Sequence, residues 1–402
     1  MPDLRTLLYL VVALRVTLLI AHPPQFVQTP RGVLERGITV NGDFAYHFGI
    51  AENTQQGLLP YHDYWYEYPP LIPLISGGIY ALSDRRFSSY ANLLALVLIA
   101  FDVGNILLVR GIGKALYGIP VGDTLAWTYA LMPAPLILGF WNFEGVVTFF
   151  LLGSLRLLIA KRDAPAGILI ALGALTKLVP LAALVAVWRV CPPRLALRTT
   201  GIALSLTGFG LGAILVFAPI YGVPSLTAQF VKPSFQTVWA LIDGNFMSGT
   251  FNGDRRDPAA IQDGRGSPPR IPPLFRLVFF GGIGAAVYAF SQRRNERGLV
   301  AFVAITVTLL YLWSAGWSTQ WQALVIPLIL LTIPTRSGVI LALALTLFSF
   351  AEYPLIFIIG ADAEGMISAA YRPLFGMAIL ARTGVLIAFA VVLFGILRQE
   401  SP

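Results

Sequence analysis

Charged residues are scarce in this chain of 402 residues. Only 12% are Asp, Glu, Lys or Arg, 56% are hydrophobic, and the mean hydropathy is +0.74. In soluble domains about a quarter of the residues are charged, so this chain has too few charged residues to cover the surface of a soluble protein. The composition excludes a secreted enzyme, a cytosolic enzyme and a disordered scaffold. It predicts an integral membrane protein with many spans.

Cysteine is almost absent, since Cys191 is the only one and no intrachain disulfide can form. No Asn-x-Ser/Thr glycosylation acceptor occurs either. Both absences favour a bacterial or archaeal cell membrane. The net charge of +8 does not indicate a nucleic-acid partner, because arginines that flank spans on the cytoplasmic side account for it.

Several catalytic motifs are also missing. The chain has no P-loop, no Gly-rich dinucleotide fingerprint, no His/Cys cluster with metal spacing and no Gly-x-Ser-x-Gly. We therefore expect no cofactor, with a divalent metal left as an alternative. Any energy source must arrive with the substrate, and an activated lipid-phosphate donor would suit a site on the outer surface.

The apolar runs predict an all-α polytopic membrane protein of about 12 transmembrane helices, a single domain over residues 1–402. Residues 22–89 form a first outer loop with membrane-surface helices, and residues 220–273 a second large outer loop. Pro165–Trp188 is predicted to be two short helices broken at Thr176–Pro180. The other expected spans are Leu4–Ala21, Tyr90–Val109, Val121–Phe140, Gly145–Ala160, Thr199–Pro219, Leu274–Phe290, Leu299–Ala315, Trp321–Ile333, Val339–Ile359 and Gly376–Leu397.

One short apolar run decides the topology. The 15 residues from Pro69 to Ser83 would make a helix of roughly 22 Å, short of the ~30 Å hydrocarbon core. If this run spans, Lys161 and Arg162 face outside; if it only dips into the membrane, they face the cytoplasm with most other basic clusters. The positive-inside rule favours the second arrangement, although it leaves Arg85 and Arg86 on the outer side.

A surface helix is expected to start at Asn41-Gly42-Asp43, with Asp43 as its N-cap. An apolar stripe of Phe44, Phe48 and Ala51 would then leave His47 elsewhere on the helix. Asp43 is either a helix cap or a catalytic acid, and His47 either an interfacial histidine or a hydrogen-bonding partner that tunes Asp43.

Two further acids are candidates. Glu144 begins a helix, where the helix dipole alone would favour it, and it would converge with Asp43 only if Pro69–Ser83 does not span. Glu67 and Tyr68 lie among aromatic residues that form either an interfacial belt or a platform for a sugar or lipid headgroup.

Charges inside apolar segments are functional candidates by default. Lys177 lies at the predicted break and could meet a phosphate there. An Arg15–Asp102 pair within the spans is expected to be structural. Arg85, Arg86, Lys232 and Arg372 are outer-side cations, each of which either binds lipid phosphate or only flanks a helix.

The order of several motifs resembles the GT-C glycosyltransferase superfamily, and is most similar to its polyprenyl-phosphomannose-dependent mannosyltransferases. The motifs extend over nearly the whole chain. They are an Asp after span one (Asp43), Gly57-x-x-Pro60-Tyr61, Tyr66-x-Tyr68-Pro69-Pro70-Leu71, Asn142-Phe143-Glu144-Gly145, Leu175-Thr176-Lys177-Leu178-Val179-Pro180 and Trp317-Ser318-Thr319-Gln320-Trp321.

The resemblance implies a polyprenyl-phosphate sugar donor, inversion at the anomeric carbon, and an acceptor that is a glycan, a glycolipid or a protein. It maps the family's catalytic acid onto Asp43 and its second acidic position onto Glu144. Some members carry a paired Asp-x-Asp where this chain has Asn41-Gly42-Asp43, which argues against a metal.

On this basis Asp43 is expected to act as the general base, oriented by His47, while Glu144 binds the acceptor. The leaving phosphate needs cations, for which Lys177 and Arg372 are candidates, with Arg85 and Arg86 behind them. Glu67, Tyr68, Trp317 and Gln320 complete the expected substrate-binding residues.

Two other classes compete with the transferase. A polytopic lipid or sugar transporter or flippase is compatible with intramembrane charges, although no internal repeat is visible. A non-catalytic subunit that binds membrane lipid is the third interpretation.

Overall fold

The computed structural model describes residues 3–29, 32–39, 41–251, 253–362 and 364–399. They form two compact units, Met1–Leu181 with Gly201–Leu226, and Ala182–Thr200 with Thr227–Pro402. Within the described residues, seven helices are long and apolar enough to cross a membrane. These are Leu4–Ala21, Phe87–Tyr117, Pro193–Phe217, Pro273–Phe290, Glu296–Trp313, Arg336–Gly360 and Arg372–Arg398. The protein is therefore a helical integral membrane protein, as its composition predicted.

Unit 1 begins with α1 (Leu4–Ala21), whose bounds match the predicted first span. A two-stranded antiparallel hairpin follows, β1 (Gln25–Thr29) with β2 (Gly32–Arg36), which was not expected in an all-α protein. The later helices of this unit are α2 (Gly42–Gln55), α3 (Leu71–Leu82), α4 (Phe87–Tyr117), α5 (Ile119–Leu131), α6 (Pro133–Leu138), α7 (Glu144–Ile159) and α8 (Asp163–Ala174).

The predicted span 121–140 is two helices, α5 and α6. Met132 separates them in an extended conformation (φ −66°, ψ 140°). Proline disfavours helical dihedrals in the residue that precedes it, and Pro133 therefore explains the interruption.

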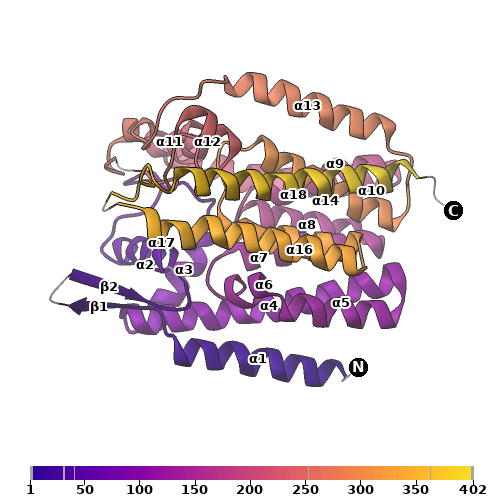
Figure 1. The fold of residues 1–402 in the computed structure, drawn as a ribbon, viewed down its shortest axis with the longest axis horizontal. Coiled ribbons are helices and arrows are strands. Elements are labelled where there is room, and N and C mark those ends of the chain that lie inside the picture. The colour runs from indigo at the N-terminus through magenta and orange to yellow at the C-terminus, as the bar shows by residue number, and fades with distance from the viewer. Residues whose placement is uncertain (1–2, 30–31, 40, 252, 363, 400–402) are drawn as a thin grey trace. The chain divides into compact units, whose positions relative to one another are not determined.

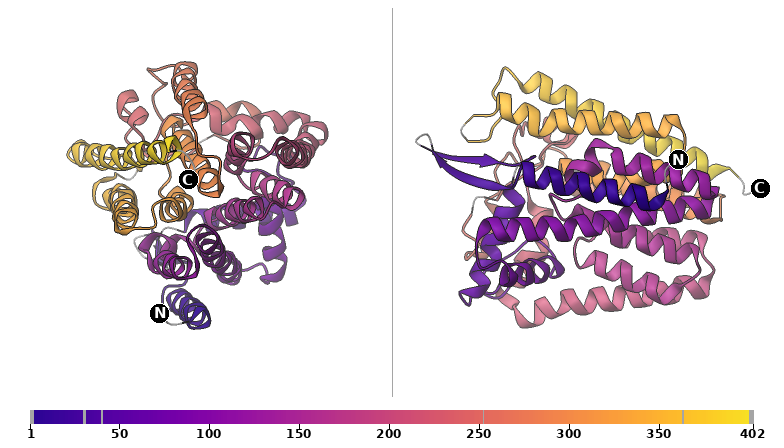
Figure 2. Two further views of the ribbon diagram at one scale, coloured as in Figure 1. Left: turned by 90° about the vertical axis from the view of Figure 1, so that its right-hand side faces the viewer. Right: turned by 90° about the horizontal axis from the view of Figure 1, so that it is seen from below.

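The short helix α3 starts and ends at one end of unit 1. Its 12 residues correspond to about 18 Å, too short for a ~30 Å core. It meets α4 near the start of that helix, where Ser76 Oγ lies 2.6 Å from Tyr90 Oη. Figures 1 and 2 show α2, α3, the hairpin and the start of α4 at the end of α1 opposite the N-terminus. With 12 residues against the 31 of α4, α3 is confined to this end of unit 1.

The core of unit 1 lies between α2, α4 and α7. Its buried side chains include Phe44, Tyr90, Phe140, Trp141 and Val146. The helices α4, α5, α7 and α8 pack in neighbouring pairs, α4 with α5 and α7, and α7 with α8.

The predicted Arg15–Asp102 pair is confirmed. Arg15 Nη2 lies 2.6 Å from Asp102 Oδ2, and both side chains are fully buried in unit 1. Tyr129 donates to the same carboxylate at 3.4 Å. Partners of opposite charge offset the cost of placing each charge inside apolar helices.

The predicted break in 165–188 is also present. Helix α8 ends at Ala174, and the 3₁₀ turn η1 (Val179–Ala182) follows before α9 (Ala183–Val190). The Thr176 hydroxyl donates back to Gly173 O at 2.6 Å, and Pro180 has no N–H to continue the ladder. The Leu71 N–H donates to Leu175 O at 2.9 Å, so α3 begins beside this break.

The helices α10 (Pro193–Phe217) and α11 (Pro219–Val231) contribute residues to both units. The predicted outer loop 220–273 is thus partly helical. The other elements of unit 2 are α12 (Val238–Asp243), η2 (Pro258–Gln262), α13 (Pro273–Phe290), α14 (Glu296–Trp313), η3 (Thr319–Trp321), α15 (Gln322–Thr332), α16 (Arg336–Phe350), η4 (Ala351–Leu355), α17 (Ile356–Gly360) and α18 (Arg372–Arg398).

Helix α15 is the centre of unit 2. Each of its 11 residues is buried, and it packs between α14 and α16. A helix that is apolar on every side belongs in an interior. The predicted continuous span 339–359 is instead interrupted at η4, where Tyr353 is non-helical (φ −146°, ψ 126°) and Pro354 lacks an N–H. This kink places Glu352 inside the unit, where its side chain is fully buried.

Candidate functional site

The helix that carries Asp43 packs on the segment that leads to Glu144. Phe44 meets the Trp141 ring edge-on at a centroid distance of 5.5 Å, and His47 meets Phe143 in the same way at 4.9 Å. Asp43 is half-buried, and Glu144 is buried as the first residue of α7. Two acidic candidates that lie about 100 positions apart in the sequence are therefore carried by elements in direct contact.

Two details of α2 differ from the expectation. The N-cap is Asn41, and Asp43 lies in the first turn, where the helix dipole favours an acid. His47 is on the buried face with Phe44, Ile50 and Ala51. The apolar stripe thus includes the histidine, because the aromatic residues of other elements give its ring apolar neighbours.

Burial lowers the pKa of His47 to about 4, while the negative charge of Glu67 opposes this shift. The imidazole is therefore neutral near pH 7. Its Nδ1 lies 3.0 Å from Tyr66 Oη, and its backbone carbonyl accepts from Ser76 Oγ at 2.9 Å. A neutral ring adds no positive charge beside Asp43, which is one turn earlier on α2.

Glu67 and Tyr68 join His47 in an aromatic cluster, defined as Tyr46, His47, Tyr61, Tyr66 and Tyr68. Tyr46 Oη donates to Glu67 Oε2 at 2.7 Å and its ring stacks on Tyr66, with centroids 5.8 Å apart. Tyr61 Oη donates to Tyr68 O at 2.6 Å. Burial raises the pKa of both Tyr61 and Tyr66 far above the usual value, so both phenols stay protonated.

The cluster is an interior feature of unit 1. Trp65 and Tyr66 are 0% exposed, and the Tyr66 N–H donates to Ser225 Oγ at 2.9 Å. An interfacial belt would expose its rings to headgroups. Tyr61 and Tyr66 are buried, whereas Tyr46 and Tyr68 are half-buried, and the Tyr46 hydroxyl holds the half-buried Glu67 carboxylate.

Glu144 and Lys177 form an ion pair, which the sequence did not predict. Lys177 Nζ donates to Glu144 Oε1; the carboxylate side chain is 4% exposed and the lysine side chain 23%. Asn142 Oδ1 accepts from the Glu144 N–H at 3.2 Å, and Asn105 Nδ2 donates to Gly145 O at 2.9 Å. Glu144 Oε2 is buried and has no hydrogen-bond partner within the described ranges. The break after α8 thus places the Lys177 ammonium group beside Glu144.

Arg85 and Arg86 are exposed in the turn between α3 and α4. Arg85 has a left-handed backbone (φ 59°), as does Asp84 (φ 50°). Their exposure is compatible with contact to lipid headgroups.

The remaining predicted residues belong to unit 2. Trp317 is fully buried, and the half-buried Gln320 is in η3. Arg372 begins α18, donates from Nε to Ile367 O at 3.2 Å and lies 4.8 Å over the Phe246 ring.

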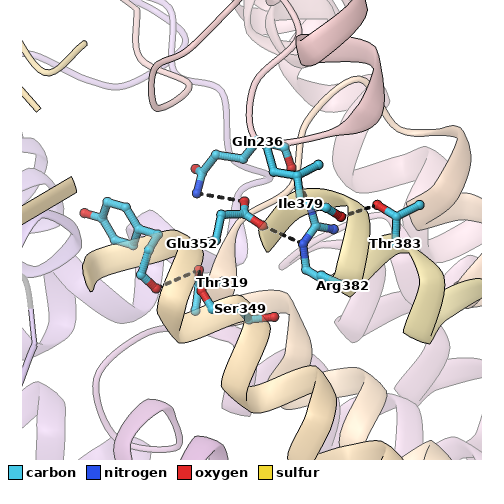
Figure 3. A network of polar contacts seen from close by, with 8 residues as sticks. Gln236, Thr319, Ser349, Glu352, Ile379, Arg382 and Thr383 are labelled. Atoms are coloured by element: carbon cyan, nitrogen blue, oxygen red, sulfur yellow. Dashed lines mark hydrogen bonds and ion pairs between the residues drawn. The ribbon is translucent and has the colours of Figure 1, made fainter. Parts of the chain in front are cut away.

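Unit 2 also contains a buried polar network that the sequence analysis missed (Figure 3). Arg382 Nε donates to Glu352 Oε2 at 2.7 Å, and Gln236 Nε2 donates to Glu352 Oε1 at 3.2 Å. The Arg382 guanidinium also lies 4.4 Å over the Trp317 ring. Two charges of opposite sign inside the apolar runs 339–359 and 376–397 were the signal that could have revealed it.

The described part of the chain contains no group of three or more His, Cys, Asp or Glu side chains placed to hold a metal ion. The arrangement offers carboxylates, one neutral imidazole and one ammonium in unit 1. Such groups can accept a proton, orient a hydroxyl and bind an anion.

No family model and no curated protein matches this sequence. Among solved structures, the chain is similar to the oligosaccharyltransferase of Archaeoglobus fulgidus. The form tethered to an acceptor peptide is 17% identical with a TM-score of 0.44, covering 99% of this chain and 55% of that one. The apo form is 15% identical with a TM-score of 0.44, covering 98% of this chain and 56% of that one. The complex with an inhibitory peptide and a dolichol-phosphate is 16% identical with a TM-score of 0.41, covering 99% of this chain and 56% of that one.

The present chain thus spans just over half the length of those proteins. At this identity, and at TM-scores of 0.44 or less, the likeness assigns no activity to it.

Proposed function

We propose that the protein is a membrane glycosyltransferase that moves a sugar, mannose in the first instance, from a polyprenyl-phosphate donor to an acceptor hydroxyl. The reaction inverts the anomeric carbon and takes place on the outer face of a bacterial or archaeal membrane. The acceptor is a glycan, a glycolipid or a protein. The observation that carries the proposal is the packing of the Asp43 helix on the segment that leads into the Glu144–Lys177 pair.

Asp43 is the general base of the proposed reaction. It takes the proton of the acceptor hydroxyl while that oxygen attacks the anomeric carbon, and the polyprenyl phosphate leaves from the opposite face. One carboxylate suffices, because direct displacement needs no covalent sugar–enzyme intermediate. His47 positions Asp43 as a neutral ring one turn later on α2, and Glu67 with Tyr68 binds sugar hydroxyls.

Lys177 stabilises the charge of the leaving phosphate. Its ammonium group is held by Glu144, and the side chain remains 23% exposed. Glu144 contacts the acceptor in the same proposal. Arg372, Arg85 and Arg86 would contact donor phosphate, and Trp317 and Gln320 the donor or its sugar.

The test is transfer of radiolabelled sugar from polyprenyl-phosphate-mannose to a membrane lipid extract, with wild type and Asp43→Asn in parallel. The substitution keeps the shape of the side chain and removes its basicity, so transfer should fall at least ~100-fold. Glu52→Gln is the matched control, since Glu52 is an exposed carboxylate on the same helix. Equal transfer by wild type and Asp43→Asn would discard Asp43 as the base.

The competing transporter would need charges within its spans, and the buried Arg15–Asp102 and Glu352–Arg382 pairs are such charges. In both pairs each charge already has a partner of opposite sign, and a structural role also explains such pairs. Movement of labelled lipid-linked sugar across proteoliposomes, without chemical transfer to any acceptor, would favour the transporter instead.

A further inference from the structure

We propose that Arg382 and Glu352 are positioning residues for the segment Trp317–Trp321, and that they set the affinity for substrate through the half-buried Gln320 of that segment. The inference rests on the proposed function for its kinetic consequence, because Trp317 and Gln320 are substrate-binding residues only within that proposal. It concerns unit 2 alone and uses residues that the proposed mechanism leaves without a role.

The Arg382 guanidinium is itself held on two sides. Nε donates to Glu352 Oε2 at 2.7 Å, and Nη2 donates to Gln236 O at 2.5 Å. Glu352 is 0% exposed and Arg382 2%. A buried charge pair that is also hydrogen-bonded has one favourable geometry, since any displacement leaves a charge uncompensated.

This fixed guanidinium covers the Trp317 ring at 4.4 Å. Tyr311 meets the same ring edge-on, with centroids 5.6 Å apart. The Trp317 indole N–H is buried and has no hydrogen-bond partner among the described residues. The contacts with its faces and edges, rather than a hydrogen bond of the indole, therefore fix the orientation of the ring. A planar guanidinium suits this role better than an ammonium, because it stacks on an aromatic face.

The backbone around Trp317 is tied to the same network. The Trp317 N–H donates to Phe235 O at 3.1 Å, next to Gln236, whose backbone is left-handed (φ 52°). A non-glycine residue keeps that conformation only where its surroundings hold it. Thr319 Oγ1 donates to Ser349 O at 3.2 Å and to Tyr353 O at 3.1 Å, on both sides of Glu352 (Figure 3).

Both ends of the segment thus depend on one kinked helix and one arginine. The Arg382–Glu352 pair does more than neutralise two charges, since its geometry is transmitted to the buried Trp317 and to the partly buried turn that follows it.

The test uses Arg382→Lys, which keeps the charge beside Glu352 but loses the planar face and the fork of donors. The matched control is Arg189→Lys, because Arg189 also lies over a ring, Tyr288 at 5.3 Å, and also donates to a carbonyl, that of Ser291. Glu352→Gln is a second variant that keeps hydrogen-bonding capacity and removes the charge. It leaves the buried Arg382 without its counter-charge, so its melting temperature should fall, and both readouts are taken below that temperature.

Two readouts separate positioning from simple stability. The first is kinetic, since Arg382→Lys should raise KM for the polyprenyl-phosphate sugar on the order of tenfold. Its kcat should stay within about twofold and its melting temperature near that of wild type. The second is a nitroxide label at Ser318 in a Cys191→Ser/Ser318→Cys background, which is feasible because Cys191 is the only cysteine. The label should be immobile with Arg382 present and mobile in Arg382→Lys.

The outcomes are distinct. A mobile label with raised KM supports the proposal, and Glu352→Gln should move both readouts in the same direction. A mobile label in a protein that transfers no sugar keeps the positioning role and removes the proposed function. An unchanged label spectrum with unchanged KM, or equal effects in Arg189→Lys, would overturn the positioning role.

Discussion

Lys177 donates to Glu144 although 33 positions separate them along the chain. The lysine follows the end of α8, the glutamate begins α7, and the two helices pack antiparallel along their lengths. The pair therefore ties the start of one helix to the end of the next at a single point of unit 1.

Breaking this pair from one side should cost stability. Lys177→Met leaves the buried Glu144 carboxylate without its cation, and we expect a loss of about 1–3 kcal/mol, since Lys177 is partly exposed. The double variant Glu144→Gln/Lys177→Met removes both charges and should recover most of that loss. Thermal unfolding in detergent measures both, and strictly additive single and double variants would contradict the coupling.

The buried histidine should make stability depend on pH. Burial lowers the pKa of His47 from 6.5 to about 4, so the unfolded chain binds its proton first as the pH falls. The stabilisation is complete above pH 6.5 and is lost progressively between about pH 6.5 and 4, on the order of 3 kcal/mol at most. His47→Gln should flatten this part of the curve of melting temperature against pH. A curve parallel to that of wild type would refute the assignment.

The Arg15–Asp102 pair should behave as a structural element. Asp102→Asn leaves a buried guanidinium uncompensated and should destabilise unit 1 by about 3–5 kcal/mol. Replacing both residues with leucine should be nearly neutral, because no charge is then buried. Activity per folded molecule should not change in the double variant. A loss of transfer with unchanged melting would give the pair a functional role instead.

Tyr46 should matter through Glu67. Tyr46→Phe removes the 2.7 Å hydrogen bond to the carboxylate, a bond to a charged group worth about 1.5–3 kcal/mol. If Glu67 binds sugar hydroxyls, KM should rise several-fold with little change in kcat. Tyr9→Phe on α1 is the control, since Tyr9 is 76% exposed. Equal KM values for the two variants would remove Glu67 from substrate binding.

Much of the fold could be predicted from local signals. The bounds of α1 follow from one apolar run that contains only two charged residues, Arg5 and Arg15. The break near Lys177 follows from a charge and Pro180 within an apolar segment. The short helix α3 was predictable because its apolar run is bounded by Pro69-Pro70 and by polar residues after Leu82. In each case the deciding information lies within a few residues.

Features that depend on distant contacts could not be predicted in the same way. His47 is buried because Phe143 and Tyr66, which are remote in sequence, surround it, and no property of α2 reveals that. Asn41, not Asp43, occupies the N-cap position of α2, and its side-chain amide donates to the hairpin carbonyls of Gln25 and Arg36 instead of capping the helix. The pairing of Glu144 with Lys177 and of Glu352 with Arg382 requires the packed helices themselves.

The hydrogen bond from the Leu71 N–H to Leu175 O gives unit 1 a mechanical link. Leu71 follows Tyr68 by three positions, and Leu175 precedes Lys177 by two. A ligand that displaces the loop carrying Glu67 would therefore also displace the segment that carries Lys177. Binding of sugar hydroxyls near Glu67 and binding of an anion at Lys177 would then be coupled through this one backbone hydrogen bond.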